Sequence, residues 1–365
     1  MLEEKLGVLV NGAGWVSTEH IKAFQKNPHT RVVAISSRRL SSAKAKAEET
    51  GLKDARLYDD FGKALEQPDV DIVSVCTPQH IHAENVVMAA EAGKHIVIEK
   101  PIANSLEEVK RMRAAVRKAG IKTVVSFVLR WNPLFETLKA MIADDALGEI
   151  YHVTADYQHD IASWWSGWSW ARRKETGVSA FLTGGCHAID AMRWFASKER
   201  YGAADPEEVF AYCGGYRKGK DVEYDYYAGV WRTGTGALEY DDLEVALVKF
   251  KNGVLGKVSV DYGCIMPYTF PLQIFGTKGT VKDNKVWSHK FPGQRDWVTI
   301  PSILPDSAEV THHPFQGEMN HFVECILQDK ESHCNLEDAI KTHEIAFAAL
   351  QCYKEKVPIK LPILK

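Results

Sequence analysis

The first 128 residues alternate short apolar runs, rich in β-branched side chains, with amphipathic stretches. Strands are expected over residues 7–11, 31–36, 72–76, 95–98 and 124–127, and helices over 18–26, 42–50, 61–66, 81–92 and 106–119. Apolar strands joined by crossover helices are typical of a parallel sheet that is covered on both faces. This part is therefore predicted to be a Rossmann domain of the α/β class, with a doubly wound parallel sheet.

The pattern changes after a further helix, which is expected over residues 133–143. Beyond Gly148, strands rich in Tyr, Val and Trp follow one another across turns such as Lys251-Asn252-Gly253, which favours a large, open, mostly antiparallel sheet. Later helices are expected over 187–196, 315–328 and 336–354. We predict two domains: residues 1–128 bind NAD or NADP, and residues 129–365 form an α/β domain for substrate binding and oligomerisation.

Composition narrows the partners of the chain. Its 365 residues are 45% apolar with a net charge of −3 and no basic stripe, so nucleic acid is not an expected partner. No run is apolar and long enough to cross a bilayer, and no secretion pattern opens the chain, so a cytoplasmic location without membrane contact is expected. Helices that cover only one face of the second sheet would leave its other face exposed, which predicts a homo-oligomer, either a dimer or a tetramer.

Metal sites are not expected. The seven cysteines are scattered and never spaced as Cys-x-x-Cys, which argues against structural zinc and against a disulfide framework. His159, Asp160, His312 and His313 match no standard ligand spacing, and solvated loops explain them better.

A glycine-rich loop, Gly12-Ala13-Gly14-Trp15-Val16-Ser17, lies between the first strand and the first helix. The amides of such a turn and the helix dipole suit a diphosphate, so Gly12, Gly14, Trp15 and Val16 are candidate cofactor ligands. Ser17 replaces the third glycine of the usual pattern, and a simple tight turn is the alternative. The position between a buried strand and a helix favours nucleotide binding.

The end of the second strand carries no acid, although a carboxylate there would bind the adenosine ribose. Ser37 and Arg38 instead offer a hydroxyl and a guanidinium, which could hold the 2′-phosphate of NADP. Stacking of Arg38 on adenine, or exposure to solvent, is an alternative of nearly equal weight. NAD and NADP therefore both remain open.

Two further strand ends carry candidate chemistry at the same carboxyl edge of the sheet. Thr77 and Pro78 follow one strand, with His82 just beyond them, and are expected to line the nicotinamide pocket, unless they only begin a helix. Glu99-Lys100-Pro101 ends the next strand, and Glu99 and Lys100 are further candidate cofactor ligands. Lys100 is expected to hydrogen-bond the reacting oxygen and stabilise the negative charge that builds there. A lysine in this place is otherwise an ordinary solvated charge.

The segment Gly184-Gly185-Cys186-His187 enters a helix of the second domain. His187 is expected to take the hydroxyl proton during oxidation, and the two glycines to let backbone approach a ligand. Thr183 would orient the substrate, and Asp190 would hold either the helix or the histidine. A lone histidine before an apolar helix is more often structural, so this assignment depends on its pairing with Lys100.

The Trp-rich segment, residues 164–174, combines tryptophans with serines, a glycine and three cations, as an exposed loop would rather than a buried core. Indole faces suit the axial hydrogens of a pyranose or a flat aglycone, so this segment is the predicted substrate wall. The candidate substrate ligands are Trp164, Trp165, Trp170 and Arg172, together with His187, and Arg130 and Asn132 are expected to contribute from the opposite side.

Together these motifs resemble the glucose–fructose oxidoreductase, inositol dehydrogenase and MocA-like family. The resemblance runs from Gly12-Ala13-Gly14 through Thr77-Pro78 and Glu99-Lys100-Pro101 to Gly184-Gly185-x-His187-x-x-Asp190. It implies NAD or NADP as cofactor and hydride transfer at a ring hydroxyl or carbonyl of sugars and cyclitols, with lysine and histidine acting together. Many members carry an aspartate four residues before the histidine, where this chain has Thr183, so an inositol-type triad does not transfer directly.

The resulting hypothesis is reversible oxidation of a secondary hydroxyl on a sugar, glycoside or cyclitol, with Lys100, His187 and Thr183 as the catalytic residues. One alternative is a non-catalytic sensor that binds dinucleotide and sugar, which would need neither an acid nor a base. Another is an enzyme whose NAD never leaves and is reset by a second sugar. The particular substrate, the carbon oxidised and the direction in the cell are not readable from the sequence.

Overall fold

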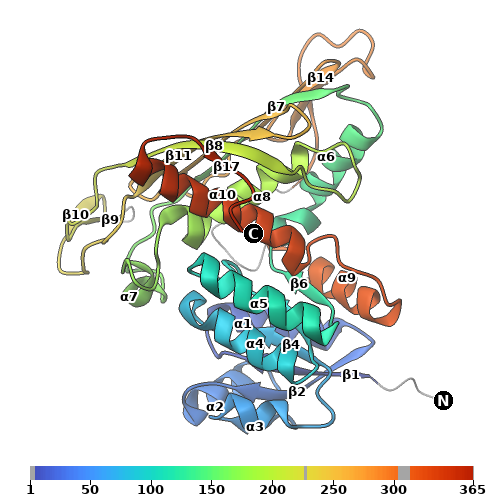
Figure 1. Ribbon diagram of the computed structural model, residues 1–365, viewed down its shortest axis with the longest axis vertical. Coiled ribbons are helices and arrows are strands. Elements are labelled where there is room, and N and C mark those ends of the chain that lie inside the picture. The colour runs from blue at the N-terminus through green and yellow to red at the C-terminus, as the bar shows by residue number, and fades with distance from the viewer. Residues whose placement is uncertain (1–4, 226–227, 303–312, 365) are drawn as a thin grey trace. The chain divides into compact units, whose positions relative to one another are not determined.

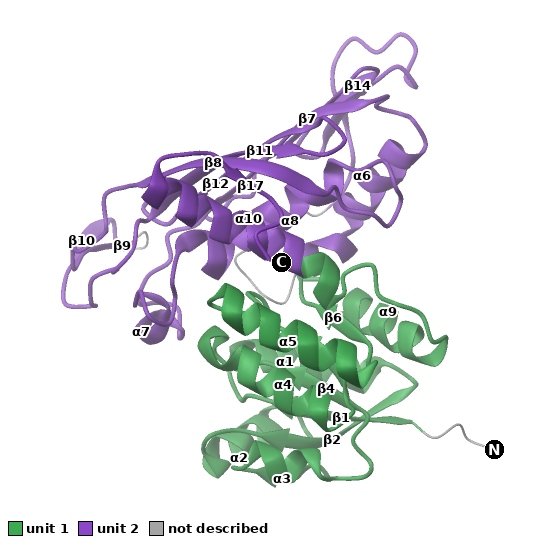
Figure 2. Cartoon of the chain, viewed as in Figure 1, with its two compact units in different colours: residues 1–128, 310–339 green, residues 129–309, 340–365 purple. Residues whose placement is uncertain are grey.

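The computed structural model describes residues 5–225, 228–302 and 313–364, which form two compact units (Figure 2). Unit 1 comprises Met1–Val128 and Val310–Ala339, and unit 2 comprises Leu129–Glu309 and Ile340–Lys365. Each unit has its own sheet, and no helix of the described residues is both long and apolar enough to span a membrane.

Unit 1 contains a six-stranded sheet in the order β3-β2-β1-β4-β5-β6, in which every neighbouring pair is parallel (Figure 1). Its strands are β1 (Leu6–Asn11), β2 (Thr30–Ser36), β3 (Arg56–Tyr58), β4 (Ile72–Val75), β5 (His95–Ile98) and β6 (Thr123–Val125). The strand order reverses between β1 and β4, where ligands bind in doubly wound sheets. The predicted Rossmann fold is confirmed, but β3 was missed because its three half-buried residues carry little apolar signal.

The crossover helices of unit 1 follow the predicted pattern. They are α1 (Trp15–Lys26), α2 (Leu40–Glu49), α3 (Phe61–Leu65), α4 (His82–Glu91) and α5 (Leu106–Ala119). The bounds of α5 match those expected: Ser105 Oγ accepts from the amide of Glu108, and Gly120 ends the helix with a φ of 63°.

A return of the chain completes unit 1. From the sequence, α9 (Phe315–Leu327) is predicted to belong to the second domain, but the structure places it in unit 1 against α1. Asn27 Nδ2 donates to Asn320 Oδ1 at 2.9 Å, and the amide of Val125 donates to the carbonyl of Cys334 at 2.8 Å. These partners are far apart in the chain, so no local pattern could have revealed them.

Unit 2 is built on a nine-stranded sheet in the order β16-β15-β14-β13-β7-β12-β11-β8-β17. Its strands are β7 (Ile150–Gln158), β8 (Pro206–Gly214), β11 (Leu243–Phe250), β12 (Leu255–Asp261), β13 (Leu272–Gly276), β14 (Gly279–Lys282), β15 (Lys285–Ser288), β16 (Val298–Thr299) and β17 (Ile359–Lys360). The β7–β12 pair is parallel and the other pairs are antiparallel, as predicted for a mostly antiparallel sheet. A separate hairpin joins β9 (Glu223–Asp225) and β10 (Val230–Arg232).

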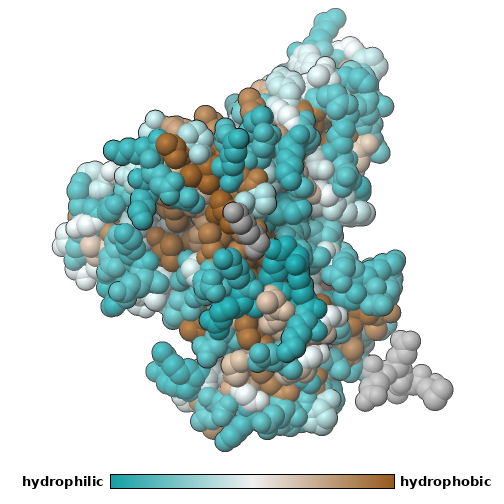
Figure 3. Space-filling model, viewed as in Figure 1, coloured by the Kyte–Doolittle hydropathy of each residue, from teal (hydrophilic) through white to brown (hydrophobic). Residues whose placement is uncertain are grey.

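The helices of unit 2 are α6 (Pro133–Ala143), α7 (Trp168–Ala171), α8 (Cys186–Phe195) and most of α10 (Leu336–Glu355). One face of the sheet packs against them: along β11, Ala246, Val248 and Phe250 are buried in the core of this unit. On the other face, the alternating residues include the exposed Tyr212 and Leu247. In Figure 3 the most extensive apolar surface on the visible side lies over unit 2.

Candidate functional site

The two glycines of the nucleotide loop differ in what requires them. Gly12 has a φ of +120°, and a Cβ there would lie 2.4 Å from the carbonyl oxygen of Cys76, so the close approach of β1 to the end of β4 demands glycine. At Gly14 a Cβ would meet no protein atom within 4 Å, so packing does not demand glycine. Gly14 is the N-cap of α1 and has no side chain that could accept from the helix amides. The amides of the first turn also have no intrahelical partner, so they can bind an anion. The turn thus fits a dinucleotide diphosphate, with the half-exposed Trp15 and the adjacent Val16 beside it.

The end of β2 presents polar groups of two kinds. Ser36 is buried and its hydroxyl donates to Asn11 Oδ1 at 2.8 Å, which ties β2 to β1. Ser37 is half-buried, with its amide bonded to the carbonyl of Tyr58, and Arg38 is exposed. An exposed guanidinium fits both the 2′-phosphate of NADP and stacking on adenine, so the choice of cofactor remains open.

His82 holds together the two turns expected around the nicotinamide. It is buried at the start of α4, with Nε2 2.7 Å from the carbonyl oxygen of Thr77 and Nδ1 2.8 Å from that of Pro101. Asn85, one turn later, donates to Thr77 Oγ1 at 2.9 Å. Both ring nitrogens of His82 contact backbone, so His82 connects the two turns, and its cofactor contact stays a prediction. Thr77 and Pro78 are half-buried at this edge.

Glu99 supports Lys100 from inside the fold. Its Oε2 accepts the amide of Lys100 at 3.1 Å, and its Oε1 lies 3.0 Å from Nε2 of His20, which reaches Ser74 Oγ through Nδ1 at 2.8 Å. Burial would raise the pKa of Glu99, but the hydrogen bond from His20 lowers it. Burial opposes the charge of His20, yet Cys76 and Glu99 raise its pKa well above the ordinary value. Glu99, predicted as a cofactor ligand, is therefore a buried carboxylate paired with an imidazolium that fixes the Lys100 backbone.

Glu318 on α9 adds a second carboxyl to this buried cluster. Burial, more than the neighbouring charges of His20 and Glu99, sets its pKa, which rises to about 8, so the group is protonated at neutral pH. The Phe315 ring lies 5.0 Å from that of His20, which closes the cluster from the same helix. Sequence reasoning missed Glu318 because it joins unit 1 only through the return of the chain.

In unit 2, the glycines before His187 serve packing. They lie in the π-helical turn η3 (Phe181–Gly185). A Cβ on Gly184 would lie 2.5 Å from Tyr262 Oη, and one on Gly185 would lie 3.0 Å from Val260 Cβ. The expectation that these glycines admit a ligand is therefore corrected: they let the turn approach the sheet at β12.

Thr183 lies within that turn, and His187 follows it at the start of α8. His187 is in the first turn of α8 and is 8% exposed. Thr183 is also buried, and its hydroxyl donates to the carbonyl of Gly177 at 3.0 Å. Since Lys100 belongs to unit 1, its pairing with His187 stays a prediction.

Asp190 holds the helix, which is one of the two roles expected for it. Arg130 donates to it through Nε at 2.8 Å and through Nη2 at 2.6 Å, and Thr342 Oγ1 donates at 3.0 Å, all in the interior. Arg130 is thus engaged in a buried bidentate pair. Asn132 caps α6 by accepting the amide of Leu134 at 2.9 Å. These contacts of Arg130 and Asn132 hold the fold, and the predicted binding of substrate by the two residues stays a prediction.

The Trp-rich segment forms a loop with the single turn α7. Trp164 is 56% exposed and its indole donates to the carbonyl of Asp160 at 2.9 Å, whereas Trp168 is buried. The half-buried rings of Trp165 and Trp170 meet edge-on at 5.4 Å, and Arg172 donates to the carbonyl of Ala237 at 3.2 Å. The predicted loop is confirmed in its exposed part, and Trp168 belongs to the core.

An aromatic group that sequence reasoning missed lies beside Trp164. The ring of His159 is 5.2 Å from Trp164 and 4.6 Å from Tyr268, and Tyr157 Oη is 3.2 Å from His159 Nδ1. The sequence pattern suggested no role for His159 other than that of a possible metal ligand. His312, another residue considered as a metal ligand, lies outside the described residues. The signal could not be found locally because Tyr268 is remote in the chain.

The dinucleotide turn, the supported lysine and the open-sheet unit define a class: oxidoreductases with an NAD-binding Rossmann domain. Residues 6–127 match the model of the oxidoreductase family with an NAD-binding Rossmann fold, and residues 135–282 match the GFO/IDH/MocA C-terminal domain. The two matches span most of the chain, which belongs to the GFO/IDH/MocA family. This confirms the family resemblance drawn from the motifs.

Individual relatives include dehydrogenases of several substrates. The chain is 31% identical over 244 residues to levoglucosan dehydrogenase of Pseudarthrobacter phenanthrenivorans, which is 62% of this chain and 58% of that one. It is 24% identical to scyllo-inositol 2-dehydrogenase (NAD(+)) of Bacillus subtilis, over 99% and 98% of the two chains. The structure of levoglucosan dehydrogenase in complex with NADH and L-sorbose shares the fold, with a TM-score of 0.84 and 22% identity over 99% of this chain and 100% of that one.

Proposed function

We propose that the protein is an NAD(P)-dependent dehydrogenase that reversibly oxidises a secondary ring hydroxyl of a sugar, glycoside or cyclitol to a ketone. The observation that carries the proposal is the support of Lys100: it lies just beyond the end of β5 at the ligand edge of the sheet, and a buried carboxylate holds its amide. A solvated surface lysine needs no such support. Relatives named for levoglucosan, scyllo-inositol and D-glucosides act on polyhydroxylated rings, which supports the substrate class.

A nicotinamide bound at this edge of the sheet would supply the hydride acceptor, and the residues of the chain would handle the oxygen and its proton. Lys100 donates a hydrogen bond to the reacting oxygen and stabilises the negative charge that develops on it. His187 accepts the hydroxyl proton and returns it in the reverse direction. Thr183, which replaces an aspartate of many family members, orients the substrate without adding charge beside the imidazole.

The substrate wall in this proposal is the exposed face of Trp164. The rings of His159 and Tyr268 extend it, which makes an aromatic surface broad enough for one sugar ring and a flat aglycone. The outer face of the unit 2 sheet, with exposed Tyr212, Leu247 and Leu255, supports the proposed homo-oligomer.

The test follows reduced-nicotinamide absorbance with NAD or NADP and a panel of hexoses, inositols and aryl glycosides. Lys100→Ala is expected to lose turnover by about 100-fold or more while the nucleotide still binds. Lys110→Ala, an exposed lysine on α5, is the matched control and should behave as the unchanged protein. Turnover retained in Lys100→Ala would overturn the mechanism.

If the unchanged protein binds nucleotide but produces no change in reduced-nicotinamide absorbance with any sugar of the panel, the non-catalytic sensor is favoured. Nucleotide that copurifies and reacts only after a second sugar is added would favour the closed cycle. His187→Asn distinguishes the non-catalytic sensor from the closed-cycle enzyme, because only an enzyme needs the imidazole for its activity.

A further inference from the structure

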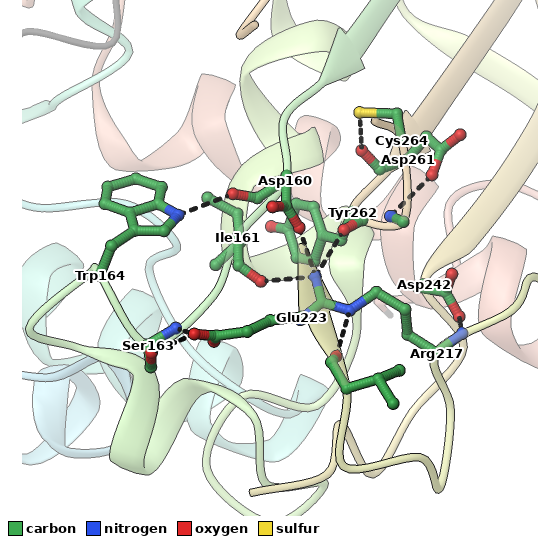
Figure 4. A network of polar contacts seen from close by, with 12 residues as sticks. Asp160, Ile161, Ser163, Trp164, Arg217, Glu223, Asp242, Asp261, Tyr262 and Cys264 are labelled. Carbon is green, nitrogen blue, oxygen red and sulfur yellow. Dashed lines mark hydrogen bonds and ion pairs between the residues drawn. The ribbon is translucent and has the colours of Figure 1, made fainter. Parts of the chain in front are cut away.

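Arg217, which no motif singled out, lies at the centre of a polar network under the Trp-rich segment (Figure 4). Its Nη1 donates to Asp160 Oδ1 at 2.7 Å, to the carbonyl of Ile161 at 2.9 Å and to that of Tyr262 at 2.8 Å. The Arg217 and Asp160 side chains are almost completely buried. One guanidinium thus joins the residues just before the Trp-rich segment to the residue that follows β12.

The backbone of Arg217 is fixed independently of that segment. The amides of Tyr216 and Arg217 donate to the two carboxylate oxygens of Asp242 at 3.0 and 2.8 Å. Arg217 Nε donates to the carbonyl of Val222 at 3.3 Å. The backbone of Arg217 is therefore held by contacts outside the Trp-rich segment, and the guanidinium of Arg217 in turn helps to position that segment.

The stretch that follows Arg217 holds Ser163, just before the Trp-rich segment, and Trp168 within it. Glu223 accepts the amide of Ser163 at 2.9 Å and its hydroxyl at 2.7 Å. Farther on, the carbonyl of Thr235 accepts the indole N–H of Trp168 at 2.9 Å. The exposed Trp164 is adjacent to Ser163, and its own indole is anchored to Asp160, the partner of Arg217. Both attachments of Trp164 therefore trace back to Arg217 and its following stretch.

The cost of this arrangement points to a role beyond stability. A buried ion pair seldom stabilises a fold more than well-packed apolar residues would, because both charges lose their hydration. It does fix geometry, since a guanidinium offers several donors in one plane. Burial also raises the pKa of Asp160 to about 6 despite the charge of Arg217.

We propose that Arg217 is a positioning residue for substrate specificity, which sets the orientation of Trp164 and through it the fit of the sugar's aglycone. This inference rests on the proposed function, in which Trp164 is the substrate wall. It predicts that loosening the network weakens binding of large glycosides more than binding of small sugars, while the chemical step is unchanged.

The experiment compares Arg217→Lys, which keeps the charge but not the planar donors, with Glu223→Gln, a milder change that leaves the Arg217–Asp160 pair intact. Arg232→Lys is the matched control, because Arg232 is an exposed residue of the β9–β10 hairpin that also contains Glu223. Each variant is labelled with 5-fluorotryptophan, and the Trp164 resonance is assigned by Trp164→Phe. KM and kcat are measured for an aryl glycoside and for the corresponding free hexose.

The expected result is a shifted or broadened Trp164 resonance in both test variants, with KM for the aryl glycoside raised about tenfold, kcat unchanged and KM for the hexose nearly unchanged. An unchanged Trp164 resonance in well-folded Arg217→Lys and Glu223→Gln would overturn the positioning role. A displaced resonance with equal KM changes for both sugars would overturn the role in specificity. Lack of any turnover in the unchanged protein would contradict the proposed function instead, while the fluorine spectrum would still decide whether Arg217 positions Trp164.

Discussion

At the scale of single residues, unit 1 concentrates three titratable groups in its interior: His20, Glu99 and Glu318. Two carboxyls and one imidazole can be buried together at a low electrostatic cost if one carboxyl keeps its proton. The directions of the pKa shifts assign that proton to Glu318, with Glu99 ionised against His20. The cluster matters because Glu99 also fixes the amide of Lys100.

Replacing Glu318 with glutamine should flatten the dependence of stability on pH. The folded protein keeps a proton on Glu318 up to a pKa of about 8, whereas the unfolded chain releases it near its ordinary value. Between these pH values the native state binds the extra proton, so stability falls as pH rises, by up to about 1.4 kcal/mol per pH unit. Urea unfolding from pH 5 to 8 measures the slope, with Glu324→Gln on the exposed side of α9 as control. An equal slope in Glu318→Gln and the unchanged protein would contradict the assignment.

Glu99→Gln tests the support of Lys100. The amide keeps the shape but removes the charge that faces His20, so the pKa of His20 should fall and the Lys100 turn should lose a charge-assisted hydrogen bond. We expect kcat to drop about tenfold to a hundredfold with nucleotide affinity nearly unchanged. Steady-state kinetics and a nucleotide titration check this; loss of nucleotide binding with kcat intact would assign Glu99 to the cofactor instead.

At the scale of elements, five of the six strands and the crossover helices of unit 1 were predictable because each carries its own signal, whereas β3 carries little and was missed. In the sequence, Ser105 and Glu108 have the spacing of a capping box and Gly120 follows as a stop signal, and α5 has the bounds that these signals predict. Roles of residues were less predictable, since they depend on contacts across elements. Gly184 packs closely against Tyr262, and Arg130 pairs with Asp190. His82 contacts two backbone carbonyls. None of these partners could be read from the local sequence.

The two glycines of the β1–α1 turn should respond differently to alanine. Gly12→Ala forces a side chain against Cys76 at a positive φ, and should lower the unfolding free energy by about 1–3 kcal/mol. Gly14→Ala meets no protein atom, so the melting temperature should stay nearly constant while the affinity for NAD or NADP falls. Thermal melts and nucleotide titrations of the two variants separate fold from ligand. A Gly14→Ala protein that binds nucleotide normally would contradict the assigned diphosphate site.

At the scale of the whole molecule, the class of each unit could be read from the hydrophobic pattern, but the membership of α9 could not. The pattern reports which face of a segment is buried, and it does not report what buries it. The same limit applies to the outer face of the unit 2 sheet, where Tyr212 and Leu247 alternate with core residues.

Leu247→Lys should disrupt the proposed oligomer. A charge in the middle of the outer sheet face cannot be buried against another subunit without a large desolvation penalty. Light scattering after size exclusion should show a smaller species than the unchanged protein, with circular dichroism unaltered. Lys110→Glu on α5 serves as a control for surface charge, and an unchanged mass in Leu247→Lys would place the interface elsewhere.

The return of α9 also decides how this protein can be recombined with its relatives. The chain passes between its two units three times, after Val128, Glu309 and Ala339. A graft that exchanges only residues 1–128 would match a foreign α1 to the native α9, and Phe315 of α9 would then pack against whatever residue replaces His20. The smallest interchangeable nucleotide-binding module therefore consists of two separate gene segments, and chimaeras that carry both should fold where single-crossover chimaeras fail.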